Sequence, residues 1–103
     1  MRVRVRTYGD LRKAIGDQIT VALNDGSTVK LLASKLRVMA NPGARDLFRE
    51  ERLRGSRVTI LLNGQNLQNL QQLDTELSDG DVVTFLPLVV GGSAVSYRRR
   101  RLW

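Results

Sequence analysis

The side chains of this sequence that could perform acid–base or metal chemistry are chiefly carboxylates, because its 103 residues include no His and no Cys. A cysteine nucleophile, a Ser–His triad, a His/Cys zinc site and a thiolate-bound iron–sulfur cluster are therefore excluded. Three carboxylates, Asp74, Asp79 and Asp81, lie close together in the sequence. The order Asp79-Gly80-Asp81 is typical of a turn. We interpret all three as turn residues and expect neither a bound metal nor a bound cofactor.

The end of the sequence holds a second candidate group, a run of four arginines: Arg98, Arg99, Arg100 and Arg101. Tyr97 and Trp103 flank the run and would add stacking surfaces, a combination suited to weak, salt-dependent binding of nucleic acid. The alternative is a solvated tail that aids solubility or marks a processing site. The run supplies most of the net charge of +7, since residues 1–92 hold 13 basic residues against 10 acidic ones.

Before this run lies a glycine pair, Gly91-Gly92, followed by Ser93. A glycine pair alone is also what a flexible linker contains. The length predicts one domain, over residues 1–90, with a flexible basic tail over residues 93–103. No apolar run reaches the about 18 residues that a membrane helix needs, and the start of the sequence lacks the apolar block of a secretory signal. We therefore expect a cytoplasmic protein without a membrane partner.

Alternation of polar and apolar residues predicts two strands in the first quarter of the chain. Over residues 2–7, Val3 and Val5 lie on one face and arginines on the other, which is typical of a half-buried strand. We interpret these arginines as a solvated face that discourages pairing at a sheet edge. After a short helical turn between Leu11 and Ile15, residues 18–23 alternate again, and Asn24-Asp25-Gly26 predicts the turn that ends this strand.

Helical spacing follows this turn. Ser27 or Thr28 can cap a helix whose apolar residues recur every three or four positions: Val29, Leu32, Ala33, Leu36, Met39 and Ala40. The helix must end before Asn41-Pro42-Gly43, because the residue before a proline is disfavoured in the helical conformation. A second, shorter helix is predicted over residues 44–53, with Leu47 and Phe48 facing inward and Gly55 closing it.

The remaining apolar residues predict two further strands, over residues 57–63 and 82–88, with Val58, Ile60, Leu62, Val83 and Phe85 facing the core. Between them, leucines at 67, 70, 73 and 77 are expected to fill the core beneath an irregular segment. The outward residues would form an apolar patch for a partner: Leu61, Val82 and Leu86, with Leu88 nearby. The alternative is that a neighbouring segment or a second copy of the chain buries this patch.

Residues 58–92 resemble the C-terminal half of the β-grasp, ubiquitin-like sulfur-carrier family, in particular its molybdopterin synthase small-subunit branch and, more distantly, the thiamine-pathway sulfur carrier. The matching features are the strand running into Asn63-Gly64, Leu73-Asp74-Thr75 with Leu77, Asp79-Gly80-Asp81, the apolar strand with Pro87, and Gly91-Gly92. The resemblance extends more loosely back to residue 2. It implies an α+β fold, a β-grasp with a mixed sheet of about four to five strands packed on one main helix.

The resemblance also implies chemistry at Gly92. A ubiquitin-activating-type adenylyltransferase would use ATP to adenylate Gly92, which the side-chain-free Gly91 helps to thread into that enzyme. The adenylate would become a thiocarboxylate that donates sulfur, with molybdopterin biosynthesis and the molybdopterin synthase large subunit as the favoured pathway and partner. The chain would then be a carrier, or the small subunit of such an enzyme, and not an enzyme by itself.

Two other functions remain open. A ubiquitin-like modifier would join Gly92 to lysines of target proteins, and a basic nucleic-acid-binding module would depend on the arginine run instead.

Eleven residues follow Gly92, whereas most sulfur carriers end there. The peptide bond between Gly92 and Ser93 occupies the acyl group that would have to react, so the full sequence is predicted to be inactive. We expect cleavage between Gly92 and Ser93, and the resemblance implies a JAMM-type metalloprotease.

Overall fold

The computed structural model describes residues 1–49, 53, 58–67 and 72–87 of the chain. Its strands are β1 (Arg2–Thr7), β2 (Gln18–Ala22), β3 (Val58–Leu62), β4 (Gln65–Asn66) and β5 (Val82–Pro87). Its helices are α1 (Arg12–Ile15), α2 (Val29–Met39) and the 3-10 segments η1 (Gly9–Leu11), η2 (Pro42–Phe48) and η3 (Gln72–Asp74). Within these residues, no helix is long and apolar enough to cross a membrane.

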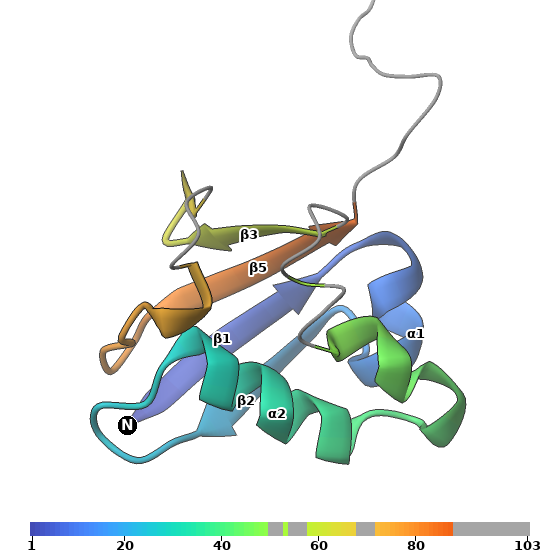
Figure 1. Ribbon diagram of the computed structural model, residues 1–103, viewed down its shortest axis with the longest axis horizontal. Coiled ribbons are helices and arrows are strands. Elements are labelled where there is room, and N and C mark those ends of the chain that lie inside the picture. The colour runs from blue at the N-terminus through green and yellow to red at the C-terminus, as the bar shows by residue number, and fades with distance from the viewer. Residues whose placement is uncertain (50–52, 54–57, 68–71, 88–103) are drawn as a thin grey trace, which may run out of the picture.

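The five strands form one mixed sheet in the order β2-β1-β5-β3-β4 (Figure 1). β1 pairs antiparallel with β2 and parallel with β5, and β5 pairs antiparallel with β3. The α+β prediction of a four- to five-stranded mixed sheet is therefore confirmed. Because β1 is hydrogen-bonded on both sides, the prediction that its arginines protect a sheet edge is wrong.

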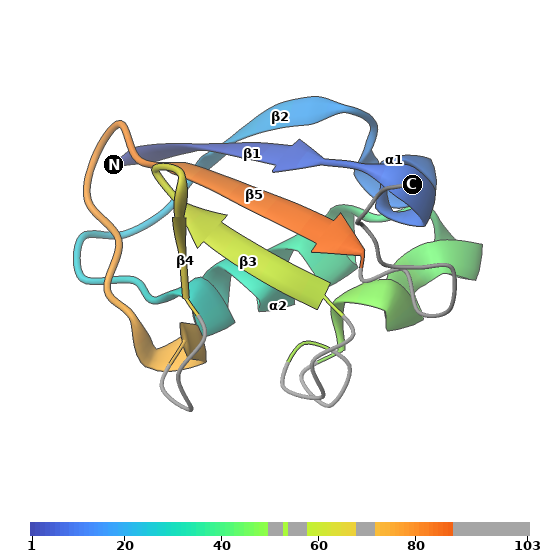
Figure 2. The same ribbon diagram turned by 90° about the horizontal axis from the view of Figure 1, so that it is seen from above.

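Helix α2 covers one face of the sheet, as Figure 2 shows from above. The Thr28 side chain accepts a hydrogen bond from the Leu31 backbone N–H at 3.3 Å, which satisfies one of the free amides of the first turn. The buried stripe of the helix consists of Val29, Leu32, Ala33 and Leu36. Met39 was expected in this stripe but is 43% exposed, because the helical repeat places it at the stripe's edge while Ala40 takes the inward position.

The predicted helix over residues 44–53 begins and ends elsewhere. The 3-10 segment η2 starts at Pro42, whose fixed φ suits a first helical position, and Arg49 is extended after it. Phe48 and Leu53 are buried, Leu47 is only half-buried, and residues 50–52 and Gly55 lie outside the described part. The ring of Phe48 packs edge-to-face on Phe85 of β5, with centroids 5.5 Å apart. This segment therefore closes the core at the carboxyl end of β5.

The irregular segment before β5 fills the other end of the core. Leu73 and Leu77 are buried and Leu67 packs against the core, as predicted, whereas Leu70 lies outside the described residues. Backbone hydrogen bonds tie this segment to the start of α2: Val29 N–H donates to the Thr75 carbonyl at 3.0 Å and Leu77 N–H to the Ser27 carbonyl at 2.8 Å. The segment thus fixes where β5 enters the sheet.

Candidate functional site

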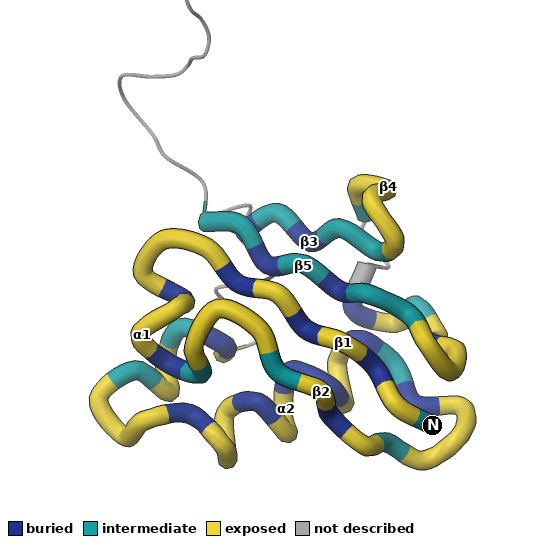
Figure 3. The backbone as a smooth tube through the Cα atoms, turned by 180° about the vertical axis from the view of Figure 1, so that it is seen from behind, coloured by how far each residue is buried: buried dark blue, intermediate teal, exposed yellow. Residues whose placement is uncertain are grey.

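The face of the sheet that α2 does not cover carries alternate residues of β1, β5 and β3 (Figure 3). Its middle strand, β5, contributes Val82, Thr84 and Leu86, all half-buried. In register beside them lie Arg4 and Arg6 of β1, opposite Val82 and Thr84. We call this surface the open face.

Leu61 of β3 joins the open face because it lies opposite Thr84 in the β3–β5 register. Together with Val82 and Leu86 it borders a shallow hollow of about 590 Å³, to which Thr84, Arg6 and Tyr8 also contribute. We call Leu61, Val82 and Leu86 the apolar patch. No described segment buries these three residues, whose side chains remain half-exposed. The predicted grouping of the three on one outward face is confirmed, and their role as a partner-binding surface stays a prediction.

One end of the hollow is fixed by the turn between β3 and β4. Asn63 and Gly64 both have positive φ, 51° and 87°, a conformation that an Asn-Gly pair tolerates in tight hairpins. The Asn63 side chain accepts from the Val82 backbone N–H at 2.9 Å and donates to the Asp81 carboxylate at 3.0 Å. This polar connection holds the β3–β4 turn against the start of β5.

The aspartates that the sequence brings together serve turns. The Asp81 carboxylate also accepts from the Ser78 N–H at 2.7 Å, and that of Asp79 accepts from the Arg2 N–H at 2.7 Å. Asp74 ends η3 with its side chain exposed. Among the described residues, no three carboxylates gather in a group that could hold a metal ion. The interpretation of Asp79 and Asp81 as turn residues is confirmed.

Tyr8 and Arg6 form the opposite rim of the hollow. The Arg6 guanidinium donates to the Tyr8 hydroxyl at 3.0 Å and lies 5.8 Å from the centre of its ring. Tyr8 is 41% exposed. Neither residue is among those predicted for the site from the sequence, although the alternation of β1 places Arg6 on the same face as the patch. The rim therefore combines an aromatic ring with a cation beside apolar side chains.

Where β5 ends, its last residue meets the loop after β1. Gly9 has φ +60°, and a Cβ at this position would lie 2.6 Å from Cγ of Pro87. Only a residue without a side chain permits so close an approach. Gly92 follows Pro87 by five residues, so it lies no more than about 18 Å from the end of β5.

The residues predicted to react or to be cleaved lie outside the described part of the chain. These are Gly91, Gly92, Ser93 and the arginines at 98–101, together with Leu88 at the predicted edge of the patch. The structure thus describes the domain and its open face up to Pro87.

Comparisons with known proteins extend to the glycine pair, Gly91-Gly92. The family model described as "ThiS family" matches residues 5–92. A chain of the complex of molybdopterin-converting factor subunits 1 and 2 from Helicobacter pylori is 32% identical, with a TM-score of 0.56 over 89% of this chain and 100% of that one. A putative molybdopterin converting factor subunit 1 from Pyrococcus furiosus is 27% identical, with a TM-score of 0.65 over 86% and 99%.

A third similar structure is the small archaeal modifier protein 1 of Methanosarcina acetivorans, which is 26% identical with a TM-score of 0.69 over 88% of this chain and 96% of that one. No curated protein matches the sequence. The family match spans most of the chain, including every strand but the first residues of β1. The chain therefore belongs to the ThiS family of β-grasp, ubiquitin-like sulfur carriers.

Proposed function

We propose that this protein carries sulfur on Gly92 for molybdopterin biosynthesis, after residues 93–103 have been removed. The observation that carries the proposal is the extent of the family match, which ends at Gly92, the second residue of the glycine pair. The molybdopterin pathway is favoured by the similarity to molybdopterin-converting factors of two organisms, at 32% and 27% identity.

The chemistry requires a free carboxylate at Gly92. One carboxylate oxygen attacks the α-phosphorus of ATP, and pyrophosphate leaves. A sulfide nucleophile then attacks the carbonyl carbon of the acyl-adenylate, AMP leaves, and the thiocarboxylate remains on Gly92. The catalytic groups belong to the adenylyltransferase, while this chain supplies the acyl group and so acts as a group-transfer reagent. The lack of cysteine in the sequence is consistent with this role, since the sulfur is held on a carbonyl carbon.

The apolar patch suits docking of the adenylyltransferase and, later, of a molybdopterin synthase large subunit. Leu61, Val82 and Leu86 form a contiguous half-exposed apolar surface that leads along β5 toward Pro87. Such surfaces commonly mark protein–protein contacts. A partner seated on this patch can reach Gly92, because Gly92 lies at most about 18 Å beyond the strand. Leu88, in the same direction along the chain, is proposed to extend the contact.

Removal of residues 93–103 is the activating step in this proposal. As long as the Gly92–Ser93 peptide bond is intact, no carboxylate exists at Gly92. The four arginines of the tail, Arg98 to Arg101, would then belong to the precursor and not to the active carrier. A JAMM-type metalloprotease is the proposed processing enzyme.

The test is reconstitution with a chain ending at Gly92. Every described core residue lies between Val3 and Phe85, so the shortened chain keeps the whole core. Incubated with the adenylyltransferase of its own organism, ATP and a sulfur donor, it should release pyrophosphate and gain the mass difference between sulfur and oxygen. The full chain, as the matched control, should do neither. Equal reaction of the full chain, or no adenylation of the shortened one, would overturn the proposal.

A modifier function is the second candidate, favoured by the similarity to the small archaeal modifier protein 1 of Methanosarcina acetivorans. Here a lysine amine of a target protein attacks the Gly92 adenylate, and an isopeptide bond forms as AMP leaves. The same incubation, repeated in an extract of the native cells, separates the two functions. Conjugates that carry Gly92 on lysine support the modifier, whereas a thiocarboxylate alone supports the carrier.

A further inference from the structure

None of the three arginines of β1 has an acidic partner among the described residues, and the Arg6 guanidinium contacts Tyr8. Arg2, Arg4 and Arg6 are exposed on the open face, although β1 is an interior strand of the sheet. Their neighbours in register are uncharged: Ala22, Thr20 and Gln18 on β2, and Val82 and Thr84 opposite Arg4 and Arg6 on β5. No ion pair between described residues includes any of the three arginines. We call them the arginine row.

The acidic residues adjacent in the fold are engaged by other donors. Asp17 forms its ion pair with Arg12 at 2.7 Å. Both oxygens of the Asp81 carboxylate accept hydrogen bonds, from Asn63 and from the Ser78 N–H, at 3.0 and 2.7 Å. Asp79 accepts from the backbone N–H of Arg2, and no hydrogen bond joins it to the guanidinium of that residue. The charge of the arginine row is therefore left to solvent or to a partner.

A half-buried strand does not need charged side chains on its exposed side, as the arginine row provides on β1. On β2, the neighbouring strand, the exposed positions Gln18, Thr20 and Ala22 are uncharged. Successive residues on one face of a strand lie about 7 Å apart, within the screening length of about 8 Å at physiological salt. The three cations therefore repel one another in the free protein, and an acidic surface placed over them relieves that repulsion.

The arginine row lies directly beside the apolar patch, since Arg4 is opposite Val82 and Arg6 borders the same hollow as Leu61 and Leu86. We propose that the row and the patch form one docking surface for a protein partner that presents carboxylates beside apolar side chains. Building on the proposed function, we assign that partner as the adenylyltransferase that accepts Gly92. A nucleic acid fits less well, because its phosphates would leave the patch uncovered and Arg6 already engages the one aromatic ring of the rim.

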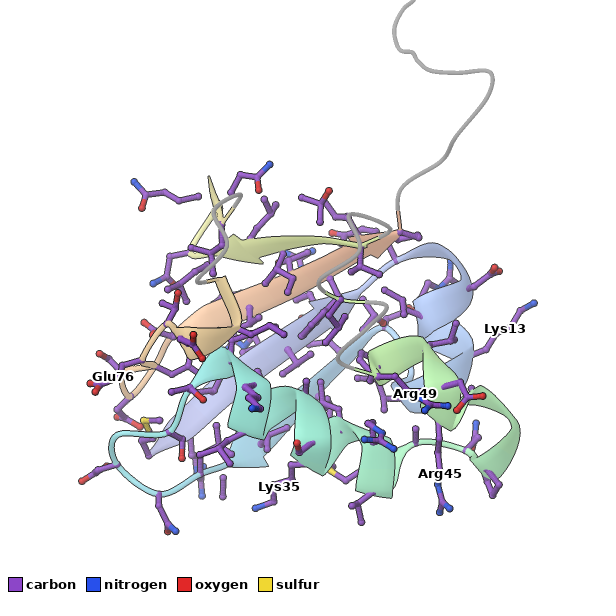
Figure 4. The ribbon with its side chains drawn as sticks, viewed as in Figure 1. Lys13, Lys35, Arg45, Arg49 and Glu76 are labelled. Carbon is purple, nitrogen blue, oxygen red and sulfur yellow. The ribbon has the colours of Figure 1, made fainter. Side chains whose placement is uncertain are left out.

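The experiment measures binding without ATP, so that it does not depend on adenylation. The chain ending at Gly92, which lacks the arginines of the tail, is titrated with the adenylyltransferase of its own organism by calorimetry. Arg4→Glu should weaken binding about tenfold or more, because it places like charges against the partner, whereas Arg4→Lys should remain close to wild type. Arg45→Glu is the matched control, since Arg45 projects from η2 on the helical side of the sheet (Figure 4).

The titrations are repeated as the ionic strength is raised from about 0.01 M to about 1 M, which shortens the Debye length from about 30 Å to about 3 Å. The added salt should weaken binding of the wild type and affect binding of Arg4→Glu much less. Urea unfolding of each variant controls for folding. Unchanged affinity of Arg4→Glu, or equal loss with Arg45→Glu, would overturn the proposal. So would tighter binding of a single-stranded RNA oligonucleotide or of phosphatidylserine vesicles through the same arginines. If Arg4→Glu binds with normal affinity and the chain is still adenylated, only the docking surface is refuted. If binding depends on the arginine row but Gly92 is not adenylated, only the carrier function is refuted.

Discussion

Neighbouring residues of β5 have opposite environments. Val83 and Phe85 are fully buried in the core, whereas Val82 and Leu86 are half-buried on the open face. The buried side of β5 is apolar and ends at an aromatic pair, Phe48 and Phe85. The open side combines apolar residues with cations, an arrangement that stabilises the fold little. The difference indicates that one face of the sheet is shaped by folding and the other by binding.

Truncation of adjacent residues on β5 gives the largest expected contrast. Phe85→Ala should lower the free energy of unfolding by about 3–5 kcal/mol, because a buried ring and its edge-to-face contact are lost. Leu86→Ala should lower it by about 1 kcal/mol or less, since that side chain is already half-exposed. Urea titration measures both. Similar losses of unfolding free energy for the two variants would contradict the division of the sheet into a folding face and a binding face.

Gly9→Ala tests the contact between Gly9 and Pro87, the last residue of β5 before the chain continues toward Gly92. It should cost about 2 kcal/mol, from a non-glycine residue at φ +60° together with the contact on Pro87. Gly26→Ala is the control, because φ is +84° there but no atom lies within 4 Å of the added Cβ, and about 1 kcal/mol is expected.

The double variant Gly9→Ala with Pro87→Ala should lose less stability than the sum of its single changes, since the ring that meets the new methyl group is gone. If the losses of unfolding free energy simply add, the contact between Gly9 and Pro87 does not contribute to the cost of Gly9→Ala.

Asn63→Gly probes the polar connection at the end of the hollow. The variant keeps the positive φ but removes the hydrogen bonds to Asp81 and to the Val82 N–H, with an expected loss of about 1–2 kcal/mol. Asn63→Ala should lose about 1 kcal/mol more, because alanine tolerates this conformation poorly. Chemical denaturation measures both, and equal stability of the two variants would contradict the assigned role of φ.

Arg4→Gln should have the smallest effect on folding. Because Arg4 is exposed and lacks an ion pair with any described residue, the free energy of unfolding should change by less than about 0.5 kcal/mol. Thermal unfolding measures the change. A large destabilisation would mean that the arginine row supports the sheet, which would remove the contrast between a folding face and a binding face.

In β1 and β5, local pattern was enough to predict which residues face inward. The alternation at Val3, Val5, Val83 and Phe85 matches their burial, since a strand's faces follow from its period of two. Turns at Asn63-Gly64 and around Gly80 were also predictable, because few residues tolerate the positive φ that both positions adopt.

Strand order was not predictable from the same patterns. The arginines of β1 were assigned to an edge because alternation reveals a solvated face but not the number of hydrogen-bonded neighbours. The parallel pairing of β1 with β5 joins Arg4 to Val82, residues far apart in the sequence, and no local signal encodes such a pairing. Similarly, the extent of η2 depends on how Phe48 reaches Phe85, which is a tertiary contact.

The site was predictable in part. Strand parity was enough to predict that Leu61, Val82 and Leu86 share a face. The strand register, which no local pattern predicts, brings Tyr8, Asn63 and the arginine row to the same hollow.

The most direct test of the carrier function is the intact mass of the protein isolated from its native cells while the pathway is active. The proposed function predicts a chain that ends at Gly92, with a fraction heavier by the difference between one sulfur and one oxygen atom. An active protein that retains residues 93–103 would contradict it.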